Sequence, residues 1–381
     1  SFFGFLFLCW VKFRANFFEF LLTFRFVYVK MSSSDQVAET CDACDRKEDL
    51  RALLFLSSFF ILRRYNMPYQ PIKPFLTYSQ QLYKLSVEKN LQIMDLSAAR
   101  TALTDICYYT LIDGYKNLFY NSMTRQYFPG TDFHDILSLY HFDQSLRELI
   151  FRFLCSIEQK MRSLISYHFS ETYSHLESDY LNPANYHHSK KNSPGITKLI
   201  YILSMEAKTN TNHAHVVYQR KTYGNVPLWV IMNTLTFGQI SKMYSFFTTS
   251  LQSKISKNFS SVNEKELSQY LKVLTHFRNV CAHNERLFSF CCRIDIPNTR
   301  LHQKLSIPKK GSQYLQGKSD LFAIIIIFRY LLSPKDFRLL KKELSYLIDK
   351  LLSQSPVLKK STLLDSMGFP SNWDQITRYK P

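Results

Sequence analysis

The sequence is poor in glycine, and this limits its fold class. Only 9 of the 381 residues are glycine, whereas 32 are phenylalanine and 24 are tyrosine. Apolar residues recur at helical spacing over long stretches, and few segments show the alternation of a half-buried strand. Low glycine content together with this periodicity argues against a protein of many strands and predicts an all-α fold.

The eight cysteines lack the spacing of a disulfide framework, which favours a reducing cytoplasm. Cys41 and Cys44 have the spacing of half a zinc site, but the only other close pair is Cys291 and Cys292. Four ligands at tetrahedral spacing are therefore not available from these pairs. We expect no metal site and no cofactor.

Long uncharged hydrophobic runs are also missing. The apolar opening, residues 1–30, is interrupted by Lys12, Arg14, Glu19 and Arg25, so it does not reach the roughly 20 residues of a membrane span. We expect residues 1–66 to be a leader or upstream extension outside the fold, since Met67 precedes the first convincing domain sequence. The alternative is a membrane-surface anchor. "LFAIIIIFRYLL" (321–332) is shorter than a span, and we expect a buried helix there.

Helical patterns divide the rest of the chain into a domain at 67–292 and a loop and helical segment at 293–381 that packs on it. Thr77 is the predicted N-cap of the first helix. The longest pattern covers 135–170 and carries one apolar stripe, with Glu158 at its margin. A helix is predicted from Pro227 to a stop at Gly238. Another opens with a capping box from Ser261 to Glu264.

Acidic residues are scarce relative to basic ones. There are 48 lysines and arginines against 30 aspartates and glutamates, a formal charge of +18. Excess positive charge of this size favours polyanionic partners such as nucleic acid or anionic lipid. RNA, single-stranded or structured, is the partner we expect.

The segment "HFRNVCAHNERL" (276–287) places polar residues on two sides of one helix. At 100° per residue, Arg278 falls inside the apolar stripe of Leu267, Leu271 and Leu274, where a guanidinium needs a partner. Asn279 and His283 are four residues apart and fall off that stripe.

A second arginine and histidine at similar spacing, Arg162 and His168, show the opposite pattern. His168 falls on the apolar stripe of its helix and Arg162 outside it. We expect His168 to be a core residue with one nitrogen hydrogen-bonded.

Arginine beside histidine suits RNA cleavage. An imidazole can exchange a proton with the ribose 2′-hydroxyl or the leaving oxygen, and a guanidinium stabilises charge on the phosphate. On the residues alone, a buried arginine–carboxylate pair with a surface histidine explains the pattern about equally well.

"RNVCAHNERL" resembles the signature of the Abi-like abortive-infection proteins, the AbiD/AbiF type of phage-resistance protein. Four other stretches resemble the family in order, from "KPFLTYSQQLYKL" to "PLWVIMNTLTFGQISKMY", over roughly 71–292. The resemblance implies a HEPN-type helical bundle and a toxin-like, metal-independent endoribonuclease that leaves a 2′,3′-cyclic phosphate. It also implies a homodimer, because active sites in the related proteins are completed between two HEPN units.

By position in the motif, the resemblance makes Arg278 and His283 the catalytic pair and Asn279 their polar support. Glu158 is the candidate carboxylate that holds Arg278, and His276 and Arg286 are candidate RNA-binding residues.

"CYYTLIDGY" (107–115) departs from the family's usual "GYYRLSGY", with Thr110 in place of an arginine.

Two alternatives to a nuclease remain. One is a non-catalytic RNA-binding module in which Tyr108, Tyr109 and Tyr115 stack on bases, although tyrosines in amphipathic helices are more often core. The other is a membrane-surface protein attached through residues 1–66.

Overall fold

A helix of 40 residues, α6 (Phe133–Thr172), is the longest element of the described part of the chain, residues 74–381. The structure is a computed structural model, and Leu76–Pro381 forms one unit. The predicted leader (1–66) and the Cys41–Cys44 pair lie outside the described residues. Within these residues helices dominate and the strands are two residues long, which confirms the predicted all-α class.

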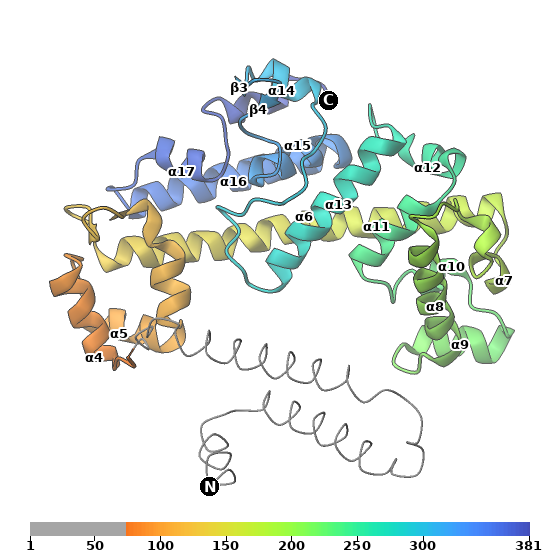
Figure 1. Cartoon of the computed structure of the whole chain (residues 1–381), viewed down its shortest axis with the longest axis horizontal. Coiled ribbons are helices and arrows are strands. Elements are labelled where there is room, and N and C mark those ends of the chain that lie inside the picture. The colour runs from red at the N-terminus through yellow and green to blue at the C-terminus, as the bar shows by residue number, and fades with distance from the viewer. Residues whose placement is uncertain (1–73) are drawn as a thin grey trace, which may run out of the picture. The chain divides into compact units, whose positions relative to one another are not determined.

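Helix numbering follows Figure 1 and begins at α4. The remaining α-helices are α4 (Tyr78–Tyr83), α5 (Leu96–Asp105), α7 (Glu177–Tyr180), α8 (Ser193–Thr209), α9 (Ala214–Tyr223), α10 (Leu228–Ile231), α11 (Phe237–Phe246), α12 (Thr249–Ser256), α13 (Glu264–Ala282), α14 (Arg300–Lys304), α15 (Leu321–Leu331), α16 (Pro334–Gln354) and α17 (Lys360–Ser366). Short π- and 3-10 turns are η1 (Lys84–Glu88), η2 (Tyr109–Asp113), η3 (Lys116–Leu118), η4 (Pro183–Asn185) and η5 (Trp373–Arg378).

Two small antiparallel hairpins interrupt the helices. β1 (Tyr120–Asn121) pairs with β2 (Gln126–Tyr127), with Tyr120 opposite Tyr127. β3 (Lys309–Lys310) pairs with β4 (Gln313–Tyr314), with Lys309 opposite Tyr314.

Helix α6 is fixed at its start by a capping box. The Asp132 carboxylate accepts from the His134 N–H at 2.8 Å, and the Asp135 carboxylate accepts from the Asp132 N–H at 2.8 Å. Such reciprocal bonds satisfy N–H groups that have no partner within the helix. The predicted apolar stripe is buried from Leu139 to Ile157, whereas Leu164 is only partly buried.

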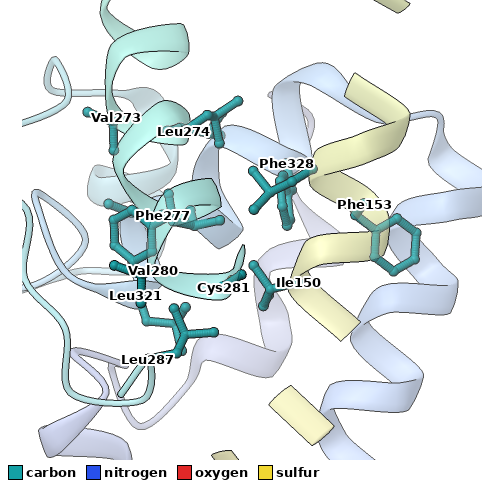
Figure 2. Packing of buried hydrophobic residues seen from close by; sticks show 14 of the residues in the cluster. Ile150, Phe153, Val273, Leu274, Phe277, Val280, Cys281, Leu287, Leu321 and Phe328 are labelled. Atoms are coloured by element: carbon teal, nitrogen blue, oxygen red, sulfur yellow. The ribbon is translucent and has the colours of Figure 1, made fainter. Parts of the chain in front are cut away.

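Helix α6 is the central packing element of the unit. It packs against α16, α13, α12, α10 and α11 (Figure 1). Side chains from α13, such as Leu274 and Phe277, meet Ile150 and Phe153 of α6 and Phe328 of α15 in one core (Figure 2). The region after residue 292 therefore shares its core with the region before it. The predicted boundaries at 66 and 292 stay predictions.

The apolar segment near the C-terminus is a buried helix, as predicted. Every residue of α15 except Arg329 is buried, and α15 packs against α13 and α16. The structure contains, in its described residues, no helix that is both long and apolar enough to cross a membrane.

One predicted helix end is wrong. Gly238 does not stop a helix; it lies in the first turn of α11. Thr236 caps this helix, with the Gln239 side chain accepting from the Thr236 N–H at 2.7 Å. The preceding helix, α10, ends earlier, at Ile231. A threonine followed three residues later by a glutamine is typical of a helix start, so the sequence itself carries the signal for this boundary.

Candidate active site

Helix α13 carries the central motif and begins two residues later than predicted. The Asn263 side chain accepts from the Glu266 N–H at 2.9 Å, and the Glu266 carboxylate accepts from the Asn263 N–H at 3.0 Å. The predicted cap, Ser261, has a φ of 59°. An N-cap residue needs extended backbone, so a left-handed residue does not fill this position.

The same helix ends within the motif. His283 is the C-cap, and Asn284 follows with a φ of 55°. The Glu285 N–H donates to the Val280 carbonyl at 3.0 Å and the Asn284 N–H to the Cys281 carbonyl at 3.4 Å. These two bonds form a Schellman motif, in which asparagine tolerates the left-handed position better than most residues. The helix end therefore fixes the backbone on which His283 lies.

Arg278 forms an ion pair with a buried carboxylate on α6, although its Nε makes no hydrogen bond. Its Nε lies 3.8 Å from Glu158 Oε2, and its guanidinium carbon lies 5.8 Å from the centre of the Phe151 ring. The Nε atom is inaccessible to solvent, yet the side chain as a whole is 29% exposed. The buried edge of the guanidinium thus faces Glu158, and the exposed remainder of the side chain is open to a ligand.

Glu158 has a second arginine partner. Arg162, one turn later on α6, donates to Glu158 Oε1 at 2.5 Å and to the Leu235 carbonyl at 3.0 Å. One buried carboxylate therefore balances two guanidinium groups, and the site keeps an excess of positive charge beside α13.

The other predicted site residues form an exposed polar strip on and after α13. His276, Asn279, His283 and Arg286 are all exposed. Asn279 and His283 are one turn apart, and the His283 N–H donates to the Asn279 carbonyl at 2.9 Å. Arg286 Nη1 donates to the Gly114 carbonyl and so ties the motif to the segment after η2. Its contact with RNA stays a prediction, as do the catalytic and RNA-binding roles of the others.

A buried polar cluster that the sequence reasoning missed anchors the loop after His283. Asp143 Oδ1 accepts from the Phe288 N–H at 2.7 Å, and Oδ2 accepts from the Leu287 N–H at 3.1 Å. Arg147 Nη1 lies 2.7 Å from Asp143 Oδ2, and the Tyr115 hydroxyl donates to the same oxygen at 2.7 Å. Burial raises the pKa of Asp143, while its hydrogen bonds and Arg147 favour the ionised form. The loop that carries Arg286 is thereby fixed to α6.

Of the three tyrosines considered for base stacking in the RNA-binding alternative, Tyr115 is instead a core residue. Tyr115 is buried, stacks on Phe288 with ring centres 5.9 Å apart and donates to Asp143. Tyr108 is half-buried, and burial raises its pKa to about 12. Tyr109 is exposed. The hydroxyl of Tyr115 serves the internal cluster because a buried phenol needs a hydrogen-bond partner.

His168 also differs from its prediction. It is not a core residue with one bonded nitrogen, because both ring nitrogens have polar neighbours. Nδ1 lies 3.3 Å from Glu171 Oε2, and Nε2 lies 3.1 Å from the Asn258 amide nitrogen. Asn258 follows α12, which packs on α6, and the approach of a polar residue from another helix is not visible in the periodicity of α6 itself.

The cysteine within the motif is not positioned for chemistry. Cys281 faces the core on α13, and burial raises the pKa of its thiol to about 12 (Figure 2). A thiol at this pKa is essentially unionised at neutral pH, and the thiolate is the nucleophilic form. No group of three potential metal ligands occurs within residues 74–381.

Comparisons with known proteins identify the family. No curated protein matches the chain, and no solved structure matches it. A family model described as Abi-like protein matches residues 101–289, which span α6, the Arg278–Glu158 pair and the end of α13. The chain belongs to the Abi-like family of abortive-infection proteins, which act in phage defence.

Proposed function

We propose that this protein is a metal-independent endoribonuclease of the HEPN type, which cleaves host or phage RNA in the cytoplasm and so arrests growth. The observation that carries the proposal is the arrangement at the end of α13. Arg278 is partly exposed and lies within ion-pair distance of Glu158, and His283 is exposed at the helix C-cap one turn after Asn279. An imidazole can transfer the protons and a guanidinium can stabilise the phosphate charge in phosphodiester cleavage, and both groups lie at this helix end.

In the proposed reaction, His283 takes the proton of a ribose 2′-hydroxyl or gives one to the leaving 5′-oxygen. The 2′-oxygen then forms a bond to phosphorus while the bond to the 5′-oxygen breaks, which leaves a 2′,3′-cyclic phosphate. Arg278 stabilises the negative charge on the phosphate oxygens through charge-assisted hydrogen bonds. Asn279 holds a phosphate oxygen or orients the imidazole.

Two copies of the chain would supply both proton-transfer roles. One His283 acts as base and the second, from the other copy, as acid, since a single imidazole cannot do both in one step. A homodimer is therefore part of the proposal, and His276 and Arg286 would contact the RNA on either side of the cut.

The first prediction tests the catalytic pair. The full chain should cleave single-stranded RNA in the presence of EDTA, and His283→Ala should lower the rate by at least about 100-fold. Arg278→Ala should have an effect of similar size because it removes a donor to the phosphate. Product analysis should find 2′,3′-cyclic phosphate ends.

A matched control is His141→Ala, an exposed histidine on α6. It should cleave as the unmodified chain does, and both histidine variants should keep the melting temperature. Cleavage that survives His283→Ala unchanged contradicts the assignment. RNA binding without turnover in the unmodified chain selects the alternative, a non-catalytic RNA-binding module.

A further inference from the structure

The positive charge of the chain is unevenly distributed along the sequence. Residues 74–179 contain 9 basic and 12 acidic residues, a net charge of −3. Residues 180–263, which form η4 and α8–α12, contain 9 basic residues and a single acidic one, Glu206, a net charge of +8. Charge of one sign gathered on one group of helices creates a local field that attracts polyanions.

Exposed aromatic side chains lie on the same helices. Tyr201 on α8 is 65% exposed, Tyr218 and Tyr223 on α9 are 57% and 64% exposed, and Trp229 on α10 is 48% exposed. Most large aromatic residues in the described part of the chain are buried in the core. Aromatic rings left in water on a basic surface are the features that bases of single-stranded nucleic acid use for stacking.

The basic and aromatic residues of α8 share one face. At 100° per residue, Lys198, Tyr201, Met205 and Lys208 fall within an arc of about 80°. All four are exposed, whereas Ile196, Leu199, Leu203 and Ala207 on the other side are buried. A tyrosine thus lies between two lysines along the helix surface.

Helix α9 is fixed next to the end of this face. Arg220 Nη1 donates to the Lys208 carbonyl and Nη2 to the Asn210 carbonyl, at the C-terminal end of α8. The rings of Tyr218 and Tyr223 lie edge to face, with centres 6.1 Å apart. Helices α8, α9 and α10 pack against one another (Figure 1). Through Arg220, α9 is therefore fixed to the C-terminal end of α8, and Tyr218 and Lys221 lie on the same helix as this contact.

We propose that this α8–α9 surface, consisting of Lys198, Tyr201, Lys208, Tyr218 and Lys221, binds single-stranded RNA. The lysines pair with successive phosphates, and the two tyrosines stack on bases without reading their sequence. The surface lies on other helices than Arg278 and His283, so it adds a binding site to the candidate active site. The choice of RNA over DNA rests on the proposed nuclease function; the single-strand binding does not.

Three other partners fit this basic, aromatic surface less well than a single-stranded nucleic acid does: a membrane, a second copy of the chain and a duplex. A helix that lies in a membrane surface needs a wide apolar face, but the apolar side of α8 is already buried in the core. A second copy of the chain would bring like charges together. A duplex offers no free base faces for stacking, because its bases are stacked on one another.

The test uses the full chain and a 2′-O-methyl oligouridine of roughly 20 nucleotides, which lacks the attacking hydroxyl and cannot be cleaved. In fluorescence anisotropy, Tyr201→Ala and Tyr218→Ala should each weaken binding at least about fivefold. Tyr201→Phe, which keeps the ring, should bind as the unmodified chain does. The double variant Lys198→Gln/Lys208→Gln should reduce the slope of log Kd against log salt by about 1.4, or 0.7 for each lost phosphate contact.

Tyr346 on α16 provides the matched control. It is 64% exposed and lies between the exposed Lys342 and Lys350, but the acidic residues Glu343 and Asp349 are on the same helix. Tyr346→Ala should leave binding unchanged. Equal binding by the Tyr201→Ala, Tyr218→Ala and Tyr346→Ala variants overturns the inference, and so does binding to phosphatidylserine vesicles in place of the oligonucleotide.

The readout separates this inference from the proposed function. Because the probe cannot be cleaved, a chain without nuclease activity still reports on the surface. Normal binding of the probe together with no cleavage of unmodified RNA would contradict the proposed nuclease function and support the α8–α9 binding surface. If the chain cleaves RNA but Tyr201→Ala and Tyr218→Ala do not change binding, the α8–α9 binding surface is contradicted and the nuclease function is supported.

Discussion

Glu158 is a buried carboxylate whose charge is shared by two arginines. It lies 2.5 Å from Arg162 and 3.8 Å from Arg278, and its side chain is only 6% exposed. Removing the charge would leave two guanidinium groups next to each other with little solvent to separate them. Breaking a buried pair costs more than the pair contributes, because the remaining partner loses its compensation.

Glu158→Gln should therefore lower the free energy of unfolding by about 2 kcal/mol. It should also lower RNA cleavage, because Arg278 loses the partner that orients it. Urea unfolding measures the first effect. The matched control is Glu343→Gln, which breaks the more exposed pair with Arg152 and should cost less than about 1 kcal/mol. Equal losses for the two variants would show that Glu158 does not hold the arginines as described.

Some contacts of single residues were visible in the sequence, and others were not. The position of Arg278 inside an apolar stripe indicated a need for an acidic partner, since periodicity reports which side of a helix is buried. Asp143 gave the same signal, because at 100° per residue it falls within about 20° of Ile150 on the stripe of α6. Its partners Leu287 and Phe288 are 144 and 145 residues away, and no local pattern identifies partners at that separation.

At the scale of elements, the end of α13 decides where His283 lies. Asn284 has a left-handed backbone, a conformation that costs residues with a β-branched side chain about 1–2 kcal/mol. The helix stops there because the Schellman bonds replace the next helical ones. The imidazole is thus placed at the helix end by the backbone of its neighbour.

We expect Asn284→Gly to keep the melting temperature and the cleavage rate, because glycine adopts a positive φ without strain. Asn284→Val should lower the free energy of unfolding by about 1–2 kcal/mol and lower the cleavage rate as well. Thermal unfolding and RNA cleavage measured on both variants check this. An active Asn284→Val variant with unchanged stability would show that the helix end does not position His283.

The start of a helix was predicted correctly where the N-cap residue and the residues of the first turn indicate the same position. Thr77 caps α4 as expected, with its hydroxyl accepting from the Gln80 N–H. For α13 the predicted cap was Ser261, and only the backbone shows that Ser261 is left-handed while Asn263 is extended. The order of the helices can therefore be predicted from periodicity. Their ends depend on φ and ψ values, which cannot be predicted when several neighbouring polar residues have similar propensities.

At the scale of the whole molecule, we expect the acid stability to depend on two buried groups, His302 and Asp320, which both contact the backbone of Gly317. His302 is fully buried; its Nδ1 accepts from the Thr299 N–H at 3.1 Å, and its Nε2 lies 2.9 Å from the Gly317 carbonyl. Burial, together with the nearby charge of Lys318, lowers the pKa of His302 to about 4. The Asp320 carboxylate accepts from the Gly317 N–H at 2.8 Å, and burial raises its pKa to about 6.

The two groups act in opposite directions between pH 6 and 4. An unfolded histidine takes up a proton near pH 6.5, before the folded one, so the contribution of His302 to stability is lost as the pH falls. The folded Asp320 takes up its proton before the unfolded one, so its contribution grows as the pH falls and is lost as the pH rises through about 6. In the unmodified chain the two contributions partly cancel.

Asp320→Asn should remove the compensating contribution and leave that of His302. Asparagine keeps an oxygen that can accept from the Ala323 N–H at the start of α15, so the helix cap survives. We expect the free energy of unfolding of this variant to fall by about 3 kcal/mol between pH 6.5 and 4, more steeply than that of the unmodified chain. Urea unfolding at several pH values measures the slope, and Asp365→Asn, at an exposed position on α17, should leave it unchanged. If the Asp320→Asn slope equals that of the unmodified chain, the buried carboxyl does not offset the histidine, and acid unfolding must be governed by other groups.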